Sequence, residues 1–242
     1  LRRAINQGVF AAATDNSRPV LTGVHFGIKG SQLRLAAADG FRLAVHTMDL
    51  EDAPAEREAI VPARALGELA RMLAEVDEPL EMRFNAVGTQ VLFDLGHATL
   101  SATLLQGTFP NYDQLIPSSH ATRTEIAVAE FMRETRIASI FARDGSGIVR
   151  LVATPGEEGA PGRLLITARA EELGNNEGEL DALVDGEEAK IAFNSRYLTE
   201  VLQVLDADRV AVETSSPSSP GVLRPVGDDR YTHVVMPMFV QW

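Results

Sequence analysis

The chain has 242 residues, 45% of them hydrophobic and 23% charged, with a formal net charge of −12. This composition predicts one large globular domain or two of about 120 residues, and it excludes a mainly disordered chain or a membrane span. The sequence holds no cysteine, which excludes disulfides, thiolate metal sites, Fe–S clusters and a cysteine nucleophile, and fits a reducing cytoplasm.

The chain opens on Leu1-Arg2-Arg3-Ala4-Ile5, without an initiator methionine, a capping residue or a signal-peptide pattern. We therefore expect it to begin inside a helix and to be a fragment of a longer protein. Hydrophobic periodicity predicts helices over residues 1–13, 63–76, 128–143 and 195–205. Strands are predicted near residues 20–28, 33–38, 42–49, 58–62, 80–84, 90–95 and 98–104, and at 125–127.

The two halves of the sequence repeat one another. Residues 62–73 match 194–205, and residues 32–37 match 163–168, at nearly the same offset. A third short pair, Val9-Phe10-Ala11 with Ile140-Phe141-Ala142, falls in the same order. This agreement predicts an internal duplication, although short helix and strand patterns recur in many α/β proteins. The strand before the helix at 128–143 would have its counterpart before Leu1, so we expect the first half to lack its opening strand.

Charge is distributed unevenly between the predicted elements. The four predicted helices together carry a charge of +3. Because the net charge of the chain is −12, the remaining residues carry −15. The total argues against nucleic-acid binding, because DNA is a polyanion, but the less negative helices keep such a surface possible. The alternative is ordinary pairing along solvated helices, such as Arg64 with Glu68 and Arg71 with Glu75.

No constellation of catalytic residues is recognisable. The sequence contains neither a phosphate-binding loop with its lysine nor a Gly-x-Ser-x-Gly nucleophile elbow. Its five histidines are not spaced as metal ligands, so we expect no metal and no cofactor. A small-molecule enzyme of an unrelated α/β fold is therefore disfavoured.

An unusual apolar segment lies near the end of the sequence. The predicted strand Tyr231–Met238 is broken by Pro237, which stands between Met236 and Met238. Methionine is common at adaptable binding surfaces, whereas the alternative is a terminal core strand. The apolar residues 239–242 follow, and they could extend a binding site or fold over it.

This segment resembles the end of the bacterial DNA polymerase III β sliding clamp family. Three further stretches resemble that family in the same order: Leu21–Val24 with Ala38–Ala44, Phe109–Tyr112 with Ile116-Pro117, and Phe193–Leu198. The Asp39-Gly40 pair is also a hairpin signal. The matches run from the first residues to about residue 238, so the resemblance covers essentially the whole chain.

The resemblance implies an α+β fold with two tandem DNA-clamp domains, each an antiparallel sheet with helices on the inner face. Residues 1–116 would be the middle domain, without its first strand, and residues 117–242 the C-terminal domain. Family members have three domains, and two subunits form a ring around duplex DNA. The implied protein is a non-catalytic processivity factor in the cytoplasm, loaded by a clamp loader. It binds the replicative polymerase and repair polymerases. We expect this fragment, without a first domain, not to close a ring.

By resemblance, partners insert a short apolar peptide into a pocket between the two domains. The residues carried over to this site are Leu21, Ala38, Gly40, Phe41, Arg42, Leu43, Pro110, Leu115, Asn194, Tyr197, Val234, Val235, Met236, Pro237 and Met238. Leu21, Leu43 and Val234 could equally be core residues. Ala38 and Gln114 depart from the family pattern, in which threonine and a basic residue are frequent.

The arginines expected to face DNA are Arg2, Arg3, Arg18, Arg64, Arg71, Arg133, Arg136 and Arg196. Such contacts would be weak and independent of sequence, as sliding requires. The alternative function is a clamp-fold scaffold that binds peptides without encircling DNA.

Overall fold

The computed structural model describes residues 1–242 except 77, 144–145, 158–159 and 171–173. The chain divides into two compact units, Leu1–Tyr112 and Asp113–Trp242. The domain boundary predicted from the sequence lies slightly later, between Ile116 and Pro117.

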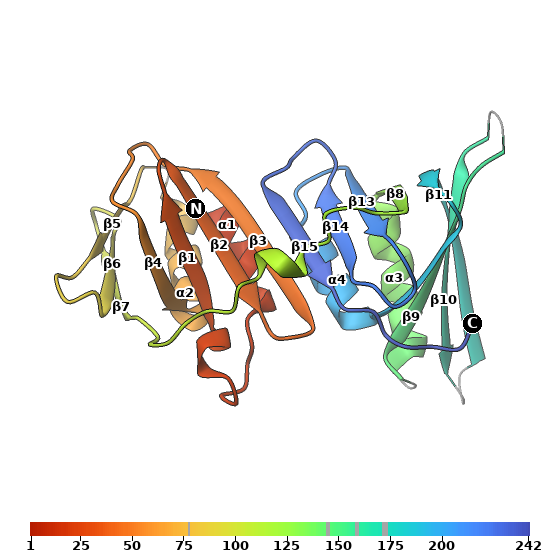
Figure 1. Cartoon of the computed structure of the whole chain (residues 1–242), viewed down its shortest axis with the longest axis horizontal. Helices are drawn as coiled ribbons and strands as arrows, with labels where there is room; N and C mark the ends of the chain where they lie inside the picture. Colours follow the sequence, from red (N-terminus) through yellow and green to blue (C-terminus); the bar gives the residue numbers. More distant parts are fainter. Residues whose placement is uncertain (77, 144–145, 158–159, 171–173) are drawn as a thin grey trace. The chain divides into compact units, whose positions relative to one another are not determined.

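The first unit combines an antiparallel four-stranded sheet with two helices on one of its faces (Figure 1). The sheet order is β4-β1-β2-β3, and a separate three-stranded sheet has the order β5-β6-β7. The helices are α1 (Arg2–Gly8) and α2 (Ala63–Met72). The strands are β1 (Gly23–Lys29), β2 (Gln32–Ala38), β3 (Arg42–Asp49), β4 (Arg57–Pro62), β5 (Glu81–Phe84), β6 (Gln90–Asp94) and β7 (Thr99–Thr103).

The core of the first unit follows from the spacing of its apolar residues. Leu66 and Leu69 lie on one side of α2 and are fully buried, as the helical spacing predicted. Ile5 of α1 and Phe26 of β1 are also buried. Burial of apolar surface between helices and sheet stabilises the unit by about 25 cal/mol per Å².

Two predicted elements of the first unit were partly wrong. Residues Pro19–Thr22, predicted to begin a strand, form a 310 helix, and the strand starts only at Gly23. Pro19 fixes φ and donates no hydrogen bond, and the Thr22 hydroxyl donates to the Pro19 carbonyl at 2.7 Å. The first predicted helix is also shorter, because α1 ends at Gly8 and only a 310 turn, Val9–Ala11, continues it.

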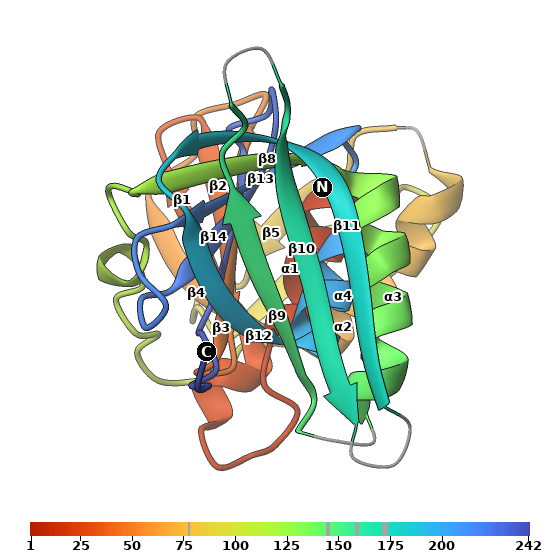
Figure 2. The same ribbon diagram turned by 90° about the vertical axis from the view of Figure 1, so that its right-hand side faces the viewer.

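The second unit has a single antiparallel sheet in the order β12-β9-β10-β11-β8-β13-β14-β15, with both helices on one face (Figure 2). The helices are α3 (Val128–Arg143) and α4 (Ser195–Val204). The strands are β8 (Thr122–Ala127), β9 (Ile148–Thr154), β10 (Gly162–Ala170), β11 (Gly174–Gly186), β12 (Ala189–Asn194), β13 (Arg209–Thr214), β14 (Gly221–Pro225) and β15 (Tyr231–Val235).

The element order confirms the predicted duplication. Each unit runs helix, four strands, helix, three strands. In the second unit, β8 precedes this series and joins the two halves of the sheet by pairing with both β11 and β13. The described residues of the first unit hold no equivalent strand, and β5-β6-β7 there form a sheet of their own.

Candidate functional site

A tight turn between β2 and β3 presents Phe41 to solvent. The Asp39 carboxylate accepts hydrogen bonds from the backbone N–H groups of Phe41 at 2.8 Å and Arg42 at 3.1 Å. Its other oxygen binds Arg42 Nε at 3.0 Å, and Arg42 Nη2 donates to the Phe10 carbonyl at 2.7 Å. Arg42 is therefore buried and fixes the turn from inside, whereas Phe41 remains 59% exposed.

Arg18 lies against this turn. Its Nη2 donates to the Asp39 carbonyl at 2.9 Å, and a Cβ on Gly40 would lie 2.6 Å from the same nitrogen. Gly40 has φ of +95°, so a side chain there would be strained as well as crowded. Near Arg18, hydrogen bonds from the Ser17 hydroxyl and backbone N–H hold the pKa of Asp15 below its usual range.

The other predicted peptide-site residues of the first unit divide by exposure. Leu21 and Leu43 are each 3% exposed and act as core residues. Ala38 pairs with Leu43 in the β2–β3 register and is half-buried. Pro110 is exposed in the segment after β7, where Phe109 and Tyr112 pack around His25 at ring-centroid distances of 5.4 and 5.7 Å.

In the second unit, Asn194 ends β12 and caps α4. Its side-chain oxygen accepts a hydrogen bond from the Arg196 backbone N–H at 2.9 Å, which satisfies one free donor of the first helical turn. Tyr197 follows in the same turn and is half-buried. Leu115 lies in the 310 helix Asp113–Leu115 and is 54% exposed.

The segment after β15 carries the two methionines singled out in the sequence. Val234 and Val235 are buried strand residues, at 3% and 0% exposure. The strand ends before Pro237, and Met236 is 45% exposed. The Met238 backbone N–H then donates to the Ala192 carbonyl at 2.8 Å, which fastens the segment to the edge strand β12.

Three of the arginines predicted to face DNA form ion pairs with glutamates. Arg71 pairs with Glu68 at 2.6 Å, Arg133 with Glu134 at 3.0 Å, and Arg196 with Glu200 at 2.8 Å. The predicted pairing of Arg71 with Glu75 is wrong, because Arg71 turns toward the glutamate three residues before it. The exposed members of the set are Arg2, Arg18, Arg64, Arg71, Arg133, Arg136 and Arg196, whereas Arg3 is half-buried.

Sequence reasoning missed two features of these surfaces. Asp39 was predicted only as part of an Asp-Gly hairpin turn, and the hydrogen bonds by which its carboxylate organises that turn were not predicted. Arg18 was assigned to the DNA-facing set, and its contact with that turn was not foreseen. The Asp-Gly sequence signalled the hairpin, but only the structure pairs it with an arginine 21 residues away.

Within the described ranges, no group of three or more histidine, aspartate or glutamate residues is placed to hold a metal ion. None of the helices in those ranges is long and apolar enough to cross a membrane. The candidate surfaces are thus an exposed aromatic turn on one unit, an exposed methionine segment on the other, and arginines on the helices.

The two units have the same helix-and-sheet fold, and each matches a different domain of one protein family. Residues 1–111 match the central domain of the DNA polymerase III beta subunit, and residues 113–239 match its C-terminal domain. The chain belongs to the DNA polymerase III beta-subunit family, as the sequence resemblance indicated, and the clamp fold predicted for both units is confirmed.

Individual relatives agree with this assignment. The beta sliding clamp of Staphylococcus aureus is 34% identical over 239 residues, and that of Staphylococcus epidermidis is 33% identical. A DNA polymerase sliding clamp from Bacillus subtilis superposes with a TM-score of 0.92 at 28% identity, and one from Pseudomonas aeruginosa with 0.90 at 27%. These matches cover 98–99% of this chain. The chain spans 62% of the length of the Staphylococcus aureus relative.

Proposed function

We propose that this chain is the partner-docking part of a DNA sliding clamp. In this proposal, the exposed residues around Phe41 and Met236 bind short apolar peptides of the replicative polymerase, the clamp loader and repair polymerases. The helices face duplex DNA, and the longer subunit forms a homodimeric ring in the cytoplasm. The chain confers processivity and catalyses no reaction itself.

The observation that carries the proposal is the exposure of Met236 within a family match that covers nearly the whole chain. Met236 is 45% exposed although both preceding residues are buried. A fixed backbone presents it, since β15 pairs with β14 before it and Met238 binds Ala192 after it. A flexible thioether on such a rigid support suits an adaptable apolar anchor.

The buried members of the proposed site have a supporting role. Leu21, Leu43, Val234 and Val235 are nearly inaccessible, so they shape the surface through packing rather than by direct contact. In this proposal, the more exposed residues, such as Phe41, Leu115 and Met236, contact the peptide directly. The helix cap uses the side-chain oxygen of Asn194, and in this proposal its NH2 group donates to the bound peptide.

The test is fluorescence anisotropy with a labelled apolar peptide rich in glutamine and leucine. We predict that Met236→Ala weakens binding by about 1–2 kcal/mol, or roughly five- to thirtyfold, as for an anchor residue. Leu183→Ala is the matched control, because Leu183 is 57% exposed on β11 of the same unit. Equal affinities of the two variants would contradict the assignment of Met236, and a lack of binding to the unaltered chain would contradict peptide docking itself.

One observation favours the second candidate, a scaffold that binds peptides without encircling DNA. Three of the helical arginines are neutralised by glutamates of their own helices, and the whole chain carries −12. Both features weaken attraction for phosphates. The two candidates share the peptide site and differ only in the DNA contacts, so DNA binding separates them.

A further inference from the structure

The segment after Met236 leads from the proposed peptide site to a second surface of the same unit. Met238 is bonded to Ala192 of β12, and Ala192 is the register partner of Arg150 in β9. Farther along, the Trp242 ring lies 6.0 Å from the Arg150 guanidinium. The segment therefore crosses β12 and reaches β9, which explains why Ala192 is fully buried although β12 is an edge strand.

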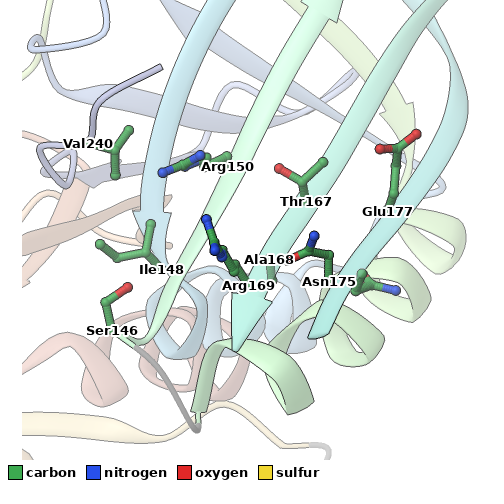
Figure 3. Close-up of a pocket in the computed structure, with 10 residues that line it drawn as sticks. Ser146, Ile148, Arg150, Thr167, Ala168, Arg169, Asn175, Glu177 and Val240 are labelled. Carbon is green, nitrogen blue, oxygen red and sulfur yellow. The ribbon is translucent and has the colours of Figure 1, made fainter. Parts of the chain in front are cut away.

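A hollow of about 370 Å³ lies where this segment meets the sheet (Figure 3). Its floor is the face of β9, β10 and β11 whose side chains alternate with the buried core residues. Cross-strand register places Arg150 beside Thr167, and Arg169 beside Asn175. Val240 lines the hollow as well, on the side of the C-terminal segment (Figure 3).

Among the described residues, the two arginines of this hollow have no carboxylate paired with them. Arg150 and Arg169 are exposed, and neither forms an ion pair with any part of the chain that the structure describes. On the same sheet face, by contrast, Arg163 pairs with Glu179 at 3.3 Å. Of the described residues that line the hollow, two are arginines and one, Glu177, is a carboxylate.

We propose that this hollow, with Arg150 and Arg169 at its floor, binds an acidic side chain in the flank of the peptide that occupies the Met236 surface. The inference rests on the proposed function and adds a specificity element to it. A guanidinium binds a carboxylate through two parallel hydrogen bonds, and Thr167 and Asn175 add further donors. The two surfaces are continuous along Met238 and Ala192, so one peptide can occupy both.

The register also predicts the spacing of the acidic residue. Two strand separations lie between the backbone of Met238 and that of Arg150, or about 10 Å. An extended peptide advances about 3.3 Å per residue, so about three residues would separate its apolar motif from the acidic side chain.

The experiment compares labelled peptides that share one apolar motif. In each peptide, a three-residue spacer joins one end of the motif, either the N-terminal or the C-terminal end, to a pair of residues. The pair is either two glutamates or two glutamines. Binding is measured for the unaltered chain, for the double variant Arg150→Gln/Arg169→Gln, and for the control Arg163→Gln. Trp242 is the only tryptophan, so its emission gives a second readout at the hollow when the peptides contain none.

For one of the two orientations, we expect the glutamate peptide to bind about three- to tenfold more tightly than its glutamine counterpart. The ratio should fall to one in the double variant, persist in Arg163→Gln, and shrink as salt is raised. The glutamine peptides should bind all three proteins equally, which shows that the double variant remains folded.

Two results would overturn the inference while leaving the proposed function intact. One is equal binding of glutamate and glutamine peptides to the unaltered chain. The other is a glutamate preference that survives in the double variant, since the acid would then be bound elsewhere. If no peptide binds the unaltered chain, the proposed function fails instead, and the acidic subsite fails with it.

Discussion

Asp39, Gly40 and Arg42 together hold the β2–β3 turn in the conformation that exposes the Phe41 side chain. Asp39 satisfies two backbone N–H groups, and Arg42 neutralises its charge from a buried position. Removal of the Asp39 carboxylate would take away the charge partner that the structure gives the buried Arg42 guanidinium in this turn, which is destabilising. Gly40 supplies the backbone conformation that a side chain would oppose. Phe41 therefore remains exposed because its neighbours are constrained.

Gly40→Ala tests this arrangement at the level of single residues. Because φ at Gly40 is +95°, alanine should destabilise the first unit by about 1–2 kcal/mol and lower its melting temperature by several degrees. The displaced turn should also weaken peptide binding through Phe41. Calorimetry and peptide anisotropy measure the two effects.

Gly30→Ala is the matched control for that prediction. Gly30 also has a positive φ, +57°, but it lies in the β1–β2 hairpin with open space where a Cβ would be. It should lose stability to a similar extent and keep the affinity for peptide. A loss of affinity in both variants would mean that the effect comes from general destabilisation rather than from the turn.

Among the elements, β15 ends at Val235, and the segment that follows it leaves the sheet through Met236 and Pro237. Before the proline, backbone pairing with β14 buries the valines. After it, a single bond to Ala192 redirects the chain across β12. The exposure of Met236 is therefore a consequence of strand termination. Farther along the segment, Val240 lines the β9–β11 hollow and Trp242 lies against Arg150 of β9.

Removal of residues 239–242 tests whether this segment covers the methionine surface. Val240 and Trp242 are placed at the β9–β11 hollow, so the shortened chain should bind the apolar peptide with unchanged affinity. The same shortened chain should show a smaller difference between glutamate and glutamine peptides, because the wall of the hollow is lost. Anisotropy titrations of both peptides measure this. Tighter binding of the apolar peptide would mean that the segment occludes the site.

The sequence predicted the elements whose periodicity is long and regular. The leucines of α2 and the matching apolar residues of α4 established the helices and the repeat. The 310 helix at Pro19 was missed, because the apolar residues 20–24 read equally well as a strand. For the proposed site, the Met-Pro-Met pattern singled out Met236, whereas Phe41 was predicted only from the resemblance. It could not predict the Arg18 contact or the Arg71–Glu68 pair, since both depend on side-chain conformations.

Over the whole chain, the helices and the remaining segments differ in charge: the helices carry a small positive charge and the rest of the chain is strongly negative. The excess of acids lies outside the helices, and three helical arginines, Arg71, Arg133 and Arg196, are paired with glutamates. Arg64 and Arg136 are exposed and form no ion pair with described residues. A surface of this kind can attract DNA only weakly, as the proposed sliding contact requires.

DNA binding by the chain should therefore be detectable only at low salt. We expect retardation of a duplex at about 50 mM salt and none at about 200 mM, because each phosphate contact contributes close to one unit to the slope of log K against log salt. Arg64→Ala with Arg136→Ala should lower that slope by about two, whereas Arg83→Ala, which removes an arginine already paired with Glu81, should leave it unchanged. Nanomolar binding at physiological salt would contradict a sliding contact. Absence of binding even at the lowest salt would favour the scaffold, because the few unpaired arginines would then be too weak to hold a duplex against a net charge of −12.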